Sequence, residues 1–198
     1  PLYSSAASDV YKRQVVASAL NFFILPLYTN VFSPADYGVI SIVNNTFVFL
    51  VIFIIFSLDN SASFWFWIKK DENERHSTFA SWIYYSFLVS SILCFSVFIF
   101  AKPISVLLLD TDKFYLVFRI NALVVFFSTI QKIATSLFRV NRQAVLAVVY
   151  TTLTSLTSIL LSMYFVLVKN MMIEGLYLGQ LISATIMFML SLWLLRKY

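Results

Sequence analysis

The amino-acid sequence predicts an all-α fold, a polytopic bundle of membrane-spanning helices. First, 61% of its 198 residues are hydrophobic and only 12% are charged, which would leave a soluble domain of this size with too little polar surface. Second, the apolar residues gather in stretches of about the ~20 residues that a helix needs to cross a bilayer. Third, these stretches lack the alternation of a membrane β-barrel, and backbone groups in lipid must be paired within a segment.

Six spans are predicted, with short polar breaks between them. The spans cover Val15–Phe32, Val39–Leu58, Ser77–Ala101, Tyr115–Phe138, Ala144–Val168 and Met172–Leu195. We interpret residues 1–14, PLYSSAASDVYKRQ, as a non-native leader, because they resemble a translated sequencing adaptor. The alternative is a native charged segment that reinforces a cytoplasmic N-terminus. Because the chain stops directly after the sixth span, we expect the natural protein to continue.

The basic residues of the breaks predict the orientation. Lys and Arg favour the cytoplasmic side, and they are more numerous in the second, fourth and sixth breaks. Those breaks hold Lys69, Lys70, Arg75, Arg139, Arg142, Arg196 and Lys197, whereas the others hold Lys102, Lys113 and Lys169, with Arg119 just inside the fourth span. We therefore expect a cytoplasmic N-terminus. The tryptophans Trp65, Trp67, Trp82 and Trp193 should anchor the bundle at the same interface.

Composition argues against several other kinds of site. The cations behind the formal charge of +5 are dispersed, whereas a nucleic-acid surface would cluster them. Cys94 is the single cysteine and lies in an apolar span, so no disulfide can form within the chain. His76 stands alone on a charged loop. We therefore expect no metal site, no cofactor and no nucleic-acid partner.

The first break has the residues of a helix start. Ser33 can cap the second helix, Pro34 suits the first helical position, and Asp36 completes a capping box three residues on. Within the first span, Asn21 and Pro26 could mark a kink.

The second and third breaks differ in character. The second holds the mixed-charge run Lys69–His76, which we expect to be solvated on the cytoplasmic face. In the third, Lys102-Pro103 should close the third helix, because proline cannot continue it. We expect Ile104–Asp112, apolar and then acidic, to form a short interfacial helix.

Asp110-Thr111-Asp112 resembles the Asp-x-Asp pair with which glycosyltransferases hold a divalent cation and a sugar nucleotide. Here the pair is expected on the external side, away from cytoplasmic nucleotide sugars, and no nucleotide-binding domain surrounds it. A solvated loop is the favoured interpretation.

The fourth span carries a polar, cationic stripe. At 100° per residue, five side chains fall within about 40° of one line: Asn121, Ser128, Lys132, Thr135 and Arg139. Ionisable groups in hydrocarbon are costly and usually face a bundle interior or a water-filled cavity, so we predict that this stripe lines a cavity. The alternative is that Lys132 and Arg139 snorkel to the cytoplasmic interface. Arg119 falls on the opposite face and is expected to snorkel to the external one.

The fifth and sixth spans carry small residues at helical spacing. The fifth has the hydroxyl stripe Thr151, Ser155, Ser158 and Ser162, and the sixth has Gly175, Gly179 and Ser183 at intervals of four. Such stripes are typical of surfaces where membrane helices pack closely, which is the expectation for both. Cavity lining is the alternative for the hydroxyl stripe.

Four segments of the chain together carry a family resemblance. They are the turn Phe32–Gly38, the stretch Ser57–Ser63 with the charged run Lys69–Arg75, the basic turn Phe138–Arg142, and the glycine pattern Gly175–Gly179. In this order, they resemble the turn after the first span, the Gly-Leu-Asp-Ser-Ala stretch with its charged loop, the basic turn after the fourth helix, and the sixth-helix glycine pattern of the polysaccharide and O-antigen flippases. These flippases belong to the multidrug, oligosaccharidyl-lipid and polysaccharide exporter superfamily. The resemblance covers essentially Val15–Tyr198. One departure is Phe64, where family members commonly have an arginine.

The resemblance implies the N-terminal lobe of an exporter that has two six-helix lobes around a central cavity. It implies that undecaprenyl-diphosphate-linked oligosaccharide is moved between leaflets of a bacterial or archaeal cytoplasmic membrane by alternating access. On this hypothesis, Lys132 and Arg139 supply the electrostatics for the diphosphate, and Asn121 and Ser128 bind sugar hydroxyls. The expected partners are the lipid-linked oligosaccharide, membrane lipid and a C-terminal lobe.

Other classes of function stay open. A multidrug antiporter binds amphipathic cations and should have acidic groups in its cavity, whereas this stripe is basic. A membrane scaffold without transport activity needs only packed spans. A membrane glycosyltransferase or polymerase should carry large catalytic loops, and no break exceeds about twenty residues, so we expect neither enzyme activity nor catalytic residues.

Overall fold

The computed structural model describes residues 28–56, 58–69 and 71–195, without the side chains of residues 59, 63, 67, 72, 76 and 195. All regular secondary structure in these ranges is helical. The helices are α2 Pro34–Ile55, α3 Leu58–Ile68, α4 Glu72–Ile99, α5 Ala101–Leu109, α6 Tyr115–Val140, α7 Ala144–Met163, the π-helix η1 Tyr164–Val168 and α8 Met172–Leu195.

The predicted all-α membrane bundle is confirmed. Five helical stretches of the described chain are long and apolar enough to cross a membrane. The first predicted span, Val15–Phe32, lies almost wholly outside the described residues, and its residues Asn21 and Pro26 lie wholly outside them.

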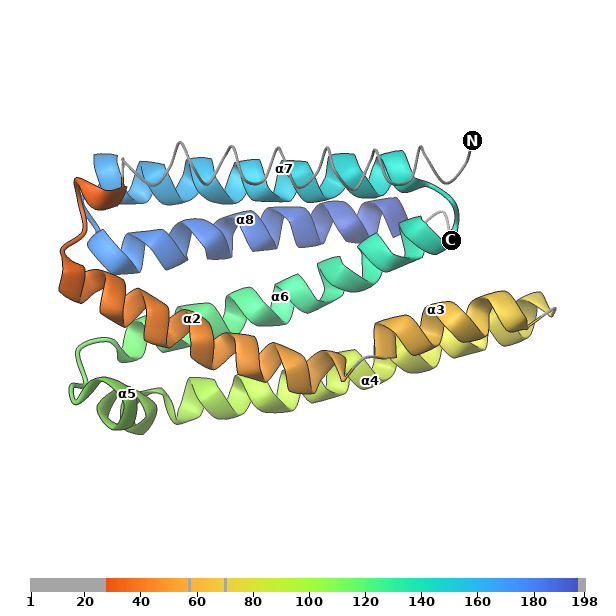
Figure 1. The fold of residues 1–198 in the computed structure, drawn as a ribbon, viewed down its shortest axis with the longest axis horizontal. Coiled ribbons are helices and arrows are strands. Elements are labelled where there is room, and N and C mark those ends of the chain that lie inside the picture. The colour runs from red at the N-terminus through yellow and green to blue at the C-terminus, as the bar shows by residue number, and fades with distance from the viewer. Residues whose placement is uncertain (1–27, 57, 70, 196–198) are drawn as a thin grey trace.

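The long helices run back and forth between two ends of the bundle (Figure 1). The connections from α3 to α4 and from α6 to α7 lie at one end, and α5 and the connection from α7 to α8 lie at the other. Alternate breaks therefore share an end, as the charge pattern requires. The end with Lys69, Arg139 and Arg142 is the one predicted to face the cytoplasm, and this orientation stays a prediction.

The second predicted span differs from the structure at both ends. Helix α2 begins at Pro34 rather than Val39, because the predicted capping box forms: Ser33 N donates to Asp36 Oδ2 at 2.9 Å and Asp36 N donates to Ser33 Oγ at 3.3 Å. The helix ends at Ile55, where Phe56 takes a left-handed conformation with φ 44°. Helix α3 then follows, although its residues after Leu58 were expected to lie in a break.

The third predicted span, Ser77–Ala101, is also shifted. Asp71 accepts a hydrogen bond from Asn73 N at 3.2 Å and caps α4, so most of the charged run is helical rather than a loop. Helix α4 ends at Ile99, before the Lys102-Pro103 pair that was expected to close it. Pro103 instead lies in the first turn of α5, where its missing N–H leaves no bond unmade. Helix α5 confirms the predicted short helix, although it begins at Ala101, three residues before the expected start at Ile104.

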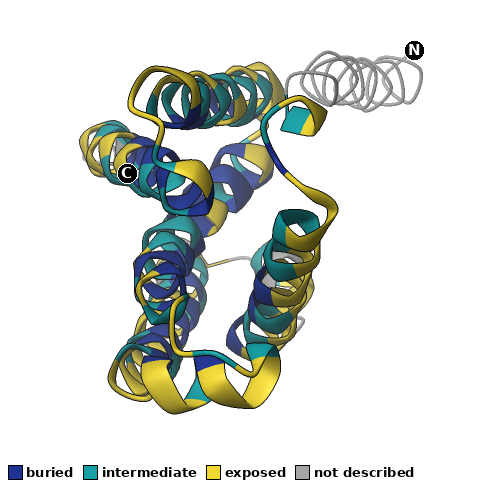
Figure 2. Cartoon of the chain, turned by 90° about the vertical axis from the view of Figure 1, so that its left-hand side faces the viewer, coloured by how far each residue is buried: buried dark blue, intermediate teal, exposed yellow. Residues whose placement is uncertain are grey.

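Helix α6 forms the centre of the bundle and packs against α2, α4, α7 and α8. Its Phe118 and Phe138 side chains are fully buried, and Gln131 Nε2 donates to the carbonyl of Ala184 in α8 at 2.7 Å. Figure 2 shows the buried residues on the sides of the helices that face one another. Close packing and hydrogen bonds between helices are what hold such a bundle together in lipid.

Helices α7 and α8 approach closely along the small-residue seam. A Cβ at Gly179 would lie 2.6 Å from the carbonyl carbon of Leu161 and would overlap the backbone of Ser162. Ser183 Oγ shares a hydrogen bond of 2.8 Å with Thr157 Oγ1. These contacts account for the spacing of small residues in α8.

The hydroxyl stripe predicted for packing is only partly in this interface. Ser162 is buried and donates to the carbonyl of Leu176 at 2.9 Å. Ser155 is exposed and donates within its own helix, to the carbonyl of Thr151. The face of α7 that meets α8 passes instead through Thr154 and Thr157, so the expectation for Ser155 was wrong.

Candidate functional site

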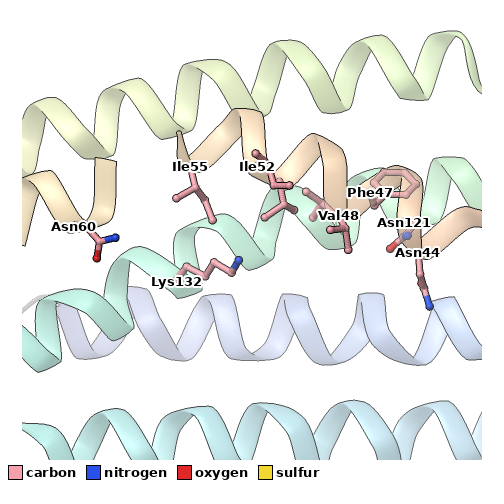
Figure 3. Close-up of a pocket in the computed structure, with 10 residues that line it drawn as sticks. Asn44, Phe47, Val48, Ile52, Ile55, Asn60, Asn121 and Lys132 are labelled. Carbon is pink, nitrogen blue, oxygen red and sulfur yellow. The ribbon is translucent and has the colours of Figure 1, made fainter. Parts of the chain in front are cut away.

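A groove of about 800 Å³ lies between α2 and α6 (Figure 3). It is lined by Asn44, Phe47, Val48, Val51, Ile52 and Ile55 of α2, Asn60 of α3, and Asn121, Val125 and Lys132 of α6. Its α2 wall opens to the outside of the molecule, since Val48 and Ile52 are 56% and 58% exposed. Most of the lining is apolar, with amide groups and one ammonium as its polar groups.

Lys132 points along α6 into this groove. Figure 3 shows its ammonium group directed towards the part of α6 that holds Asn121, and away from Asn60. This direction follows from helix geometry, because the Cα–Cβ bond of a helical residue tilts towards the N-terminus. A lysine that snorkelled to the nearer end would turn the other way, towards Asn60. The direction favours the cavity interpretation of Lys132.

The amide groups of the groove come from three helices. Asn121 is 5% exposed, so α6 holds it at the back of the groove. Asn44 accepts a hydrogen bond at 2.9 Å from the hydroxyl of Tyr177, a fully buried residue of α8, which fixes α2 against α8. Asn60 lies just beyond the break at Phe56 that separates α2 from α3.

A second, smaller cavity of about 170 Å³ adjoins the groove between α2, α4 and α6. Its lining residues are Ile55, Trp82, Ser86, Thr129, Lys132, Ile133, Ser136 and Arg139. Lys132 and Ile55 line both cavities, so the two meet at these residues. The Arg139 Nε donates to the carbonyl of Thr135 at 3.4 Å, which directs its side chain back along α6.

Trp82 has a different place from the one predicted. It is only 6% exposed and packs edge-to-face on Phe79 with ring centroids 5.7 Å apart. Its indole Nε1 is buried and has no hydrogen-bond partner among the described residues. The expectation of an interfacial anchor was therefore wrong for Trp82. Trp65 and Trp193 are about half exposed, and their role as interfacial anchors stays a prediction. The side chain of Trp67 lies outside the described part of the chain.

The predicted stripe is divided by the structure. Asn121, Lys132 and Arg139 line the two cavities. Ser128 and Thr135 line neither of them, and Thr135 Oγ1 donates within α6 to the carbonyl of Gln131 at 2.9 Å. A single line on α6 meets different neighbours along its length, because α2, α4 and α8 cover different parts of that helix.

Sequence reasoning missed Asn44, Asn60 and Trp82. A signal existed for Asn44, because a polar side chain within an apolar span is unusual, as it is for Lys132 in α6. Asn60 fell in the break between the second and third predicted spans, because nothing in the sequence indicated α3. Trp82 lacked a signal, since a tryptophan near a membrane interface is typical of an anchor.

The electrostatics of the two cavities favour an anionic group. Their described lining residues include two cations and no carboxylate. No group of three His, Cys, Asp or Glu residues that could hold a metal ion occurs in the described part of the chain. Asp110 and Asp112 are exposed beside α5. The cavities therefore offer charge and hydrogen bonds for binding an anionic group.

Comparison with known protein families identifies a match over most of the chain. Residues 13–198 match the sequence profile of a family described as polysaccharide biosynthesis protein. No curated protein and no solved structure matches the chain.

Proposed function

Because this chain belongs to the polysaccharide biosynthesis protein family, we propose that it is one lobe of a carrier that moves a lipid-linked oligosaccharide across the membrane. The family indicates a role in the synthesis or export of polysaccharide. The finer proposal, export of an undecaprenyl-diphosphate-linked oligosaccharide, adds a substrate with an anionic diphosphate, a neutral glycan and a long apolar chain.

The observation that carries the proposal is the place of Lys132, between a small cationic cavity and a larger groove lined with amides. Ionisable residues within membrane-spanning segments usually face a bundle interior or a water-filled cavity and mark the pathways of substrates and ions. An anionic substrate would meet this cation directly. The small cavity is lined by two cations, whereas the groove is lined by amides, and the substrate likewise has an anionic diphosphate and a neutral glycan.

We assign the diphosphate to the small cavity and the glycan to the groove. Lys132 and Arg139 offer charged donors, which form stronger hydrogen bonds to phosphate oxygens than neutral groups do. The amides of Asn44, Asn60 and Asn121 can both donate to and accept from sugar hydroxyls. The open side of the groove, along Val48 and Ile52, would face the second lobe, and rocking of the lobes would expose the substrate to each side in turn.

The proposal is tested in the complete protein, reconstituted in vesicles with an undecaprenyl-diphosphate oligosaccharide. Replacing Lys132 or Arg139 by Ala should lower the flipping rate at limiting substrate by roughly ten- to a hundredfold, the loss of one charge-assisted hydrogen bond. Lys113→Ala is the matched control, since it removes an exposed cation at the other end of the bundle. A flipping rate that is unchanged in both cavity variants would rule the proposal out.

A further inference from the structure

A separate apolar groove of about 540 Å³ lies between α4 and α6. Its lining consists of Ser91, Ile92, Cys94, Phe95 and Phe98 of α4 and Leu123 and Phe126 of α6. At 100° per residue, Leu123 and Phe126 lie on the face of α6 opposite Asn121 and Lys132. The groove therefore shares no lining residue with the proposed substrate site.

Aromatic contacts build the floor of this groove. The Phe126 ring packs on Phe87 of α4 at 5.7 Å and on its neighbour Phe127 at 5.5 Å. Phe127 in turn contacts Phe188 of α8 at 5.2 Å. The outward side is open, with Ile92 and Phe95 58% and 66% exposed. The surrounding medium at these helices is hydrocarbon, so an apolar chain rather than water is the natural filling.

Two cations lie at one end of the groove. The Arg119 guanidinium stands over the ring of Phe98, which lines the groove, at 5.1 Å, and over Tyr115 at 5.2 Å. Its Nε donates to the carbonyl of Phe98 at 3.2 Å. The Lys102 ammonium stands over Tyr115 at 5.3 Å. One aromatic ring thus holds both cations together.

Neither cation is neutralised by the described residues. The ion pair that the described chain forms joins Lys69 to Glu74, at the opposite end of the bundle. Stacking on Phe98 and Tyr115 fixes the direction of the Arg119 side chain but leaves its charge uncompensated. Two fixed cations at the end of an apolar groove complement a molecule with an anionic head and an apolar tail.

We propose that this groove binds a phospholipid with an anionic headgroup. One acyl chain lies along Ile92, Phe95 and Leu123, and the phosphate lies against Arg119 and Lys102. Opposite charges attract at a membrane interface, so an anionic headgroup is favoured beside these two cations. The lipid acts at a site distinct from the cavities of Lys132 and holds α4 and α6 together at the end that carries α5.

Native mass spectrometry of the complete protein in detergent tests this proposal, with phosphatidylglycerol and phosphatidylcholine as probes. Phosphatidylglycerol should bind more tightly. Replacing Arg119 or Lys102 by Gln should each weaken its binding about fivefold, the share of one cation. The same substitutions should weaken phosphatidylcholine binding less, because the positive choline group offsets the charge of its phosphate. Lys113→Gln, an exposed cation at the same end, is the control and should have no effect. Leu123→Trp fills the groove and should also weaken the phosphatidylglycerol complex.

Several outcomes would overturn the proposal. Equal binding of the two lipids would remove the headgroup assignment, and an equal loss in Lys113→Gln would reduce it to nonspecific attraction. Displacement of phosphatidylglycerol by undecaprenyl diphosphate, with Lys132→Ala unaffected, would assign the groove to the substrate chain. Lys102→Gln keeps the test decisive if Arg119→Gln does not fold, because Lys102 is exposed.

Discussion

Lys132 shows how much a single residue can indicate in a membrane protein. Its type and its depth in α6 predicted a cavity, and the structure places its ammonium in the groove beside α2. The residues that complete the cavity could not be predicted in the same way. Asn44 and Asn60 belong to other helices, and the pattern of one helix contains no information about which neighbour crosses it.

Gly179 offers a test at the level of one atom. Gly179→Ala should lower the free energy of unfolding by about 1–3 kcal/mol, because the new Cβ would overlap the backbone of Ser162 across the interface of α7 and α8. Thermal unfolding of the purified protein in detergent measures the effect.

Gly38→Ala is the matched control for this substitution. A Cβ at Gly38 would meet nothing within 4 Å, and Ala favours a helix over Gly by up to about 1 kcal/mol. Its stability should be unchanged or slightly higher. Equal destabilisation by the two substitutions would contradict the close approach of α7 and α8.

At the scale of elements, apolar length predicted the helices better than it predicted their ends. Helix α8 has the bounds read from the sequence, and α6 extends two residues beyond its predicted end. The break at Phe56 was missed because left-handed conformations are signalled by Gly or Asn, and Phe carries no such signal. The π-helix η1 was missed because its sequence, YFVLV, reads as a continuation of α7.

The capping box of α2 can be tested directly. Ser33→Ala should destabilise the first turn by about 1 kcal/mol, because it removes the side-chain acceptor of Asp36 N. Hydrogen exchange of the peptide covering this turn should become roughly fivefold faster.

Ser96→Ala provides the comparison, since the Ser96 hydroxyl donates to Ile92 O within α4 and caps no helix. Its exchange rates should be unchanged. An unaltered first turn in Ser33→Ala would show that Pro34 and the packing of α2 set the helix start without the cap.

At the scale of the whole molecule, the alternation of the breaks was predictable because it depends only on the number and length of the spans. Which end faces the cytoplasm depends on the insertion machinery and the lipid, and the charge bias predicts it. The crossing of α2 over α6, which makes the groove, had no counterpart in the sequence. The fold class was thus predictable and the geometry of the site was not.

The single native cysteine makes the orientation testable. In a Cys94→Ala background, Arg142→Cys should be inaccessible to a membrane-impermeant maleimide in intact cells and should react after permeabilisation. Lys113→Cys, at the other end of the bundle, should react in intact cells. The reverse pattern would invert the predicted topology without changing the fold.

Because Lys132 lines both the groove and the small cavity, it couples their occupants thermodynamically. An anion that neutralises the ammonium from one cavity changes the free energy of binding in the other, and linkage requires the effect to be equal in both directions. The diphosphate and the glycan of one substrate would therefore not bind as independent groups. Through this shared charge, binding of either part of the ligand changes the affinity of the site for the other part.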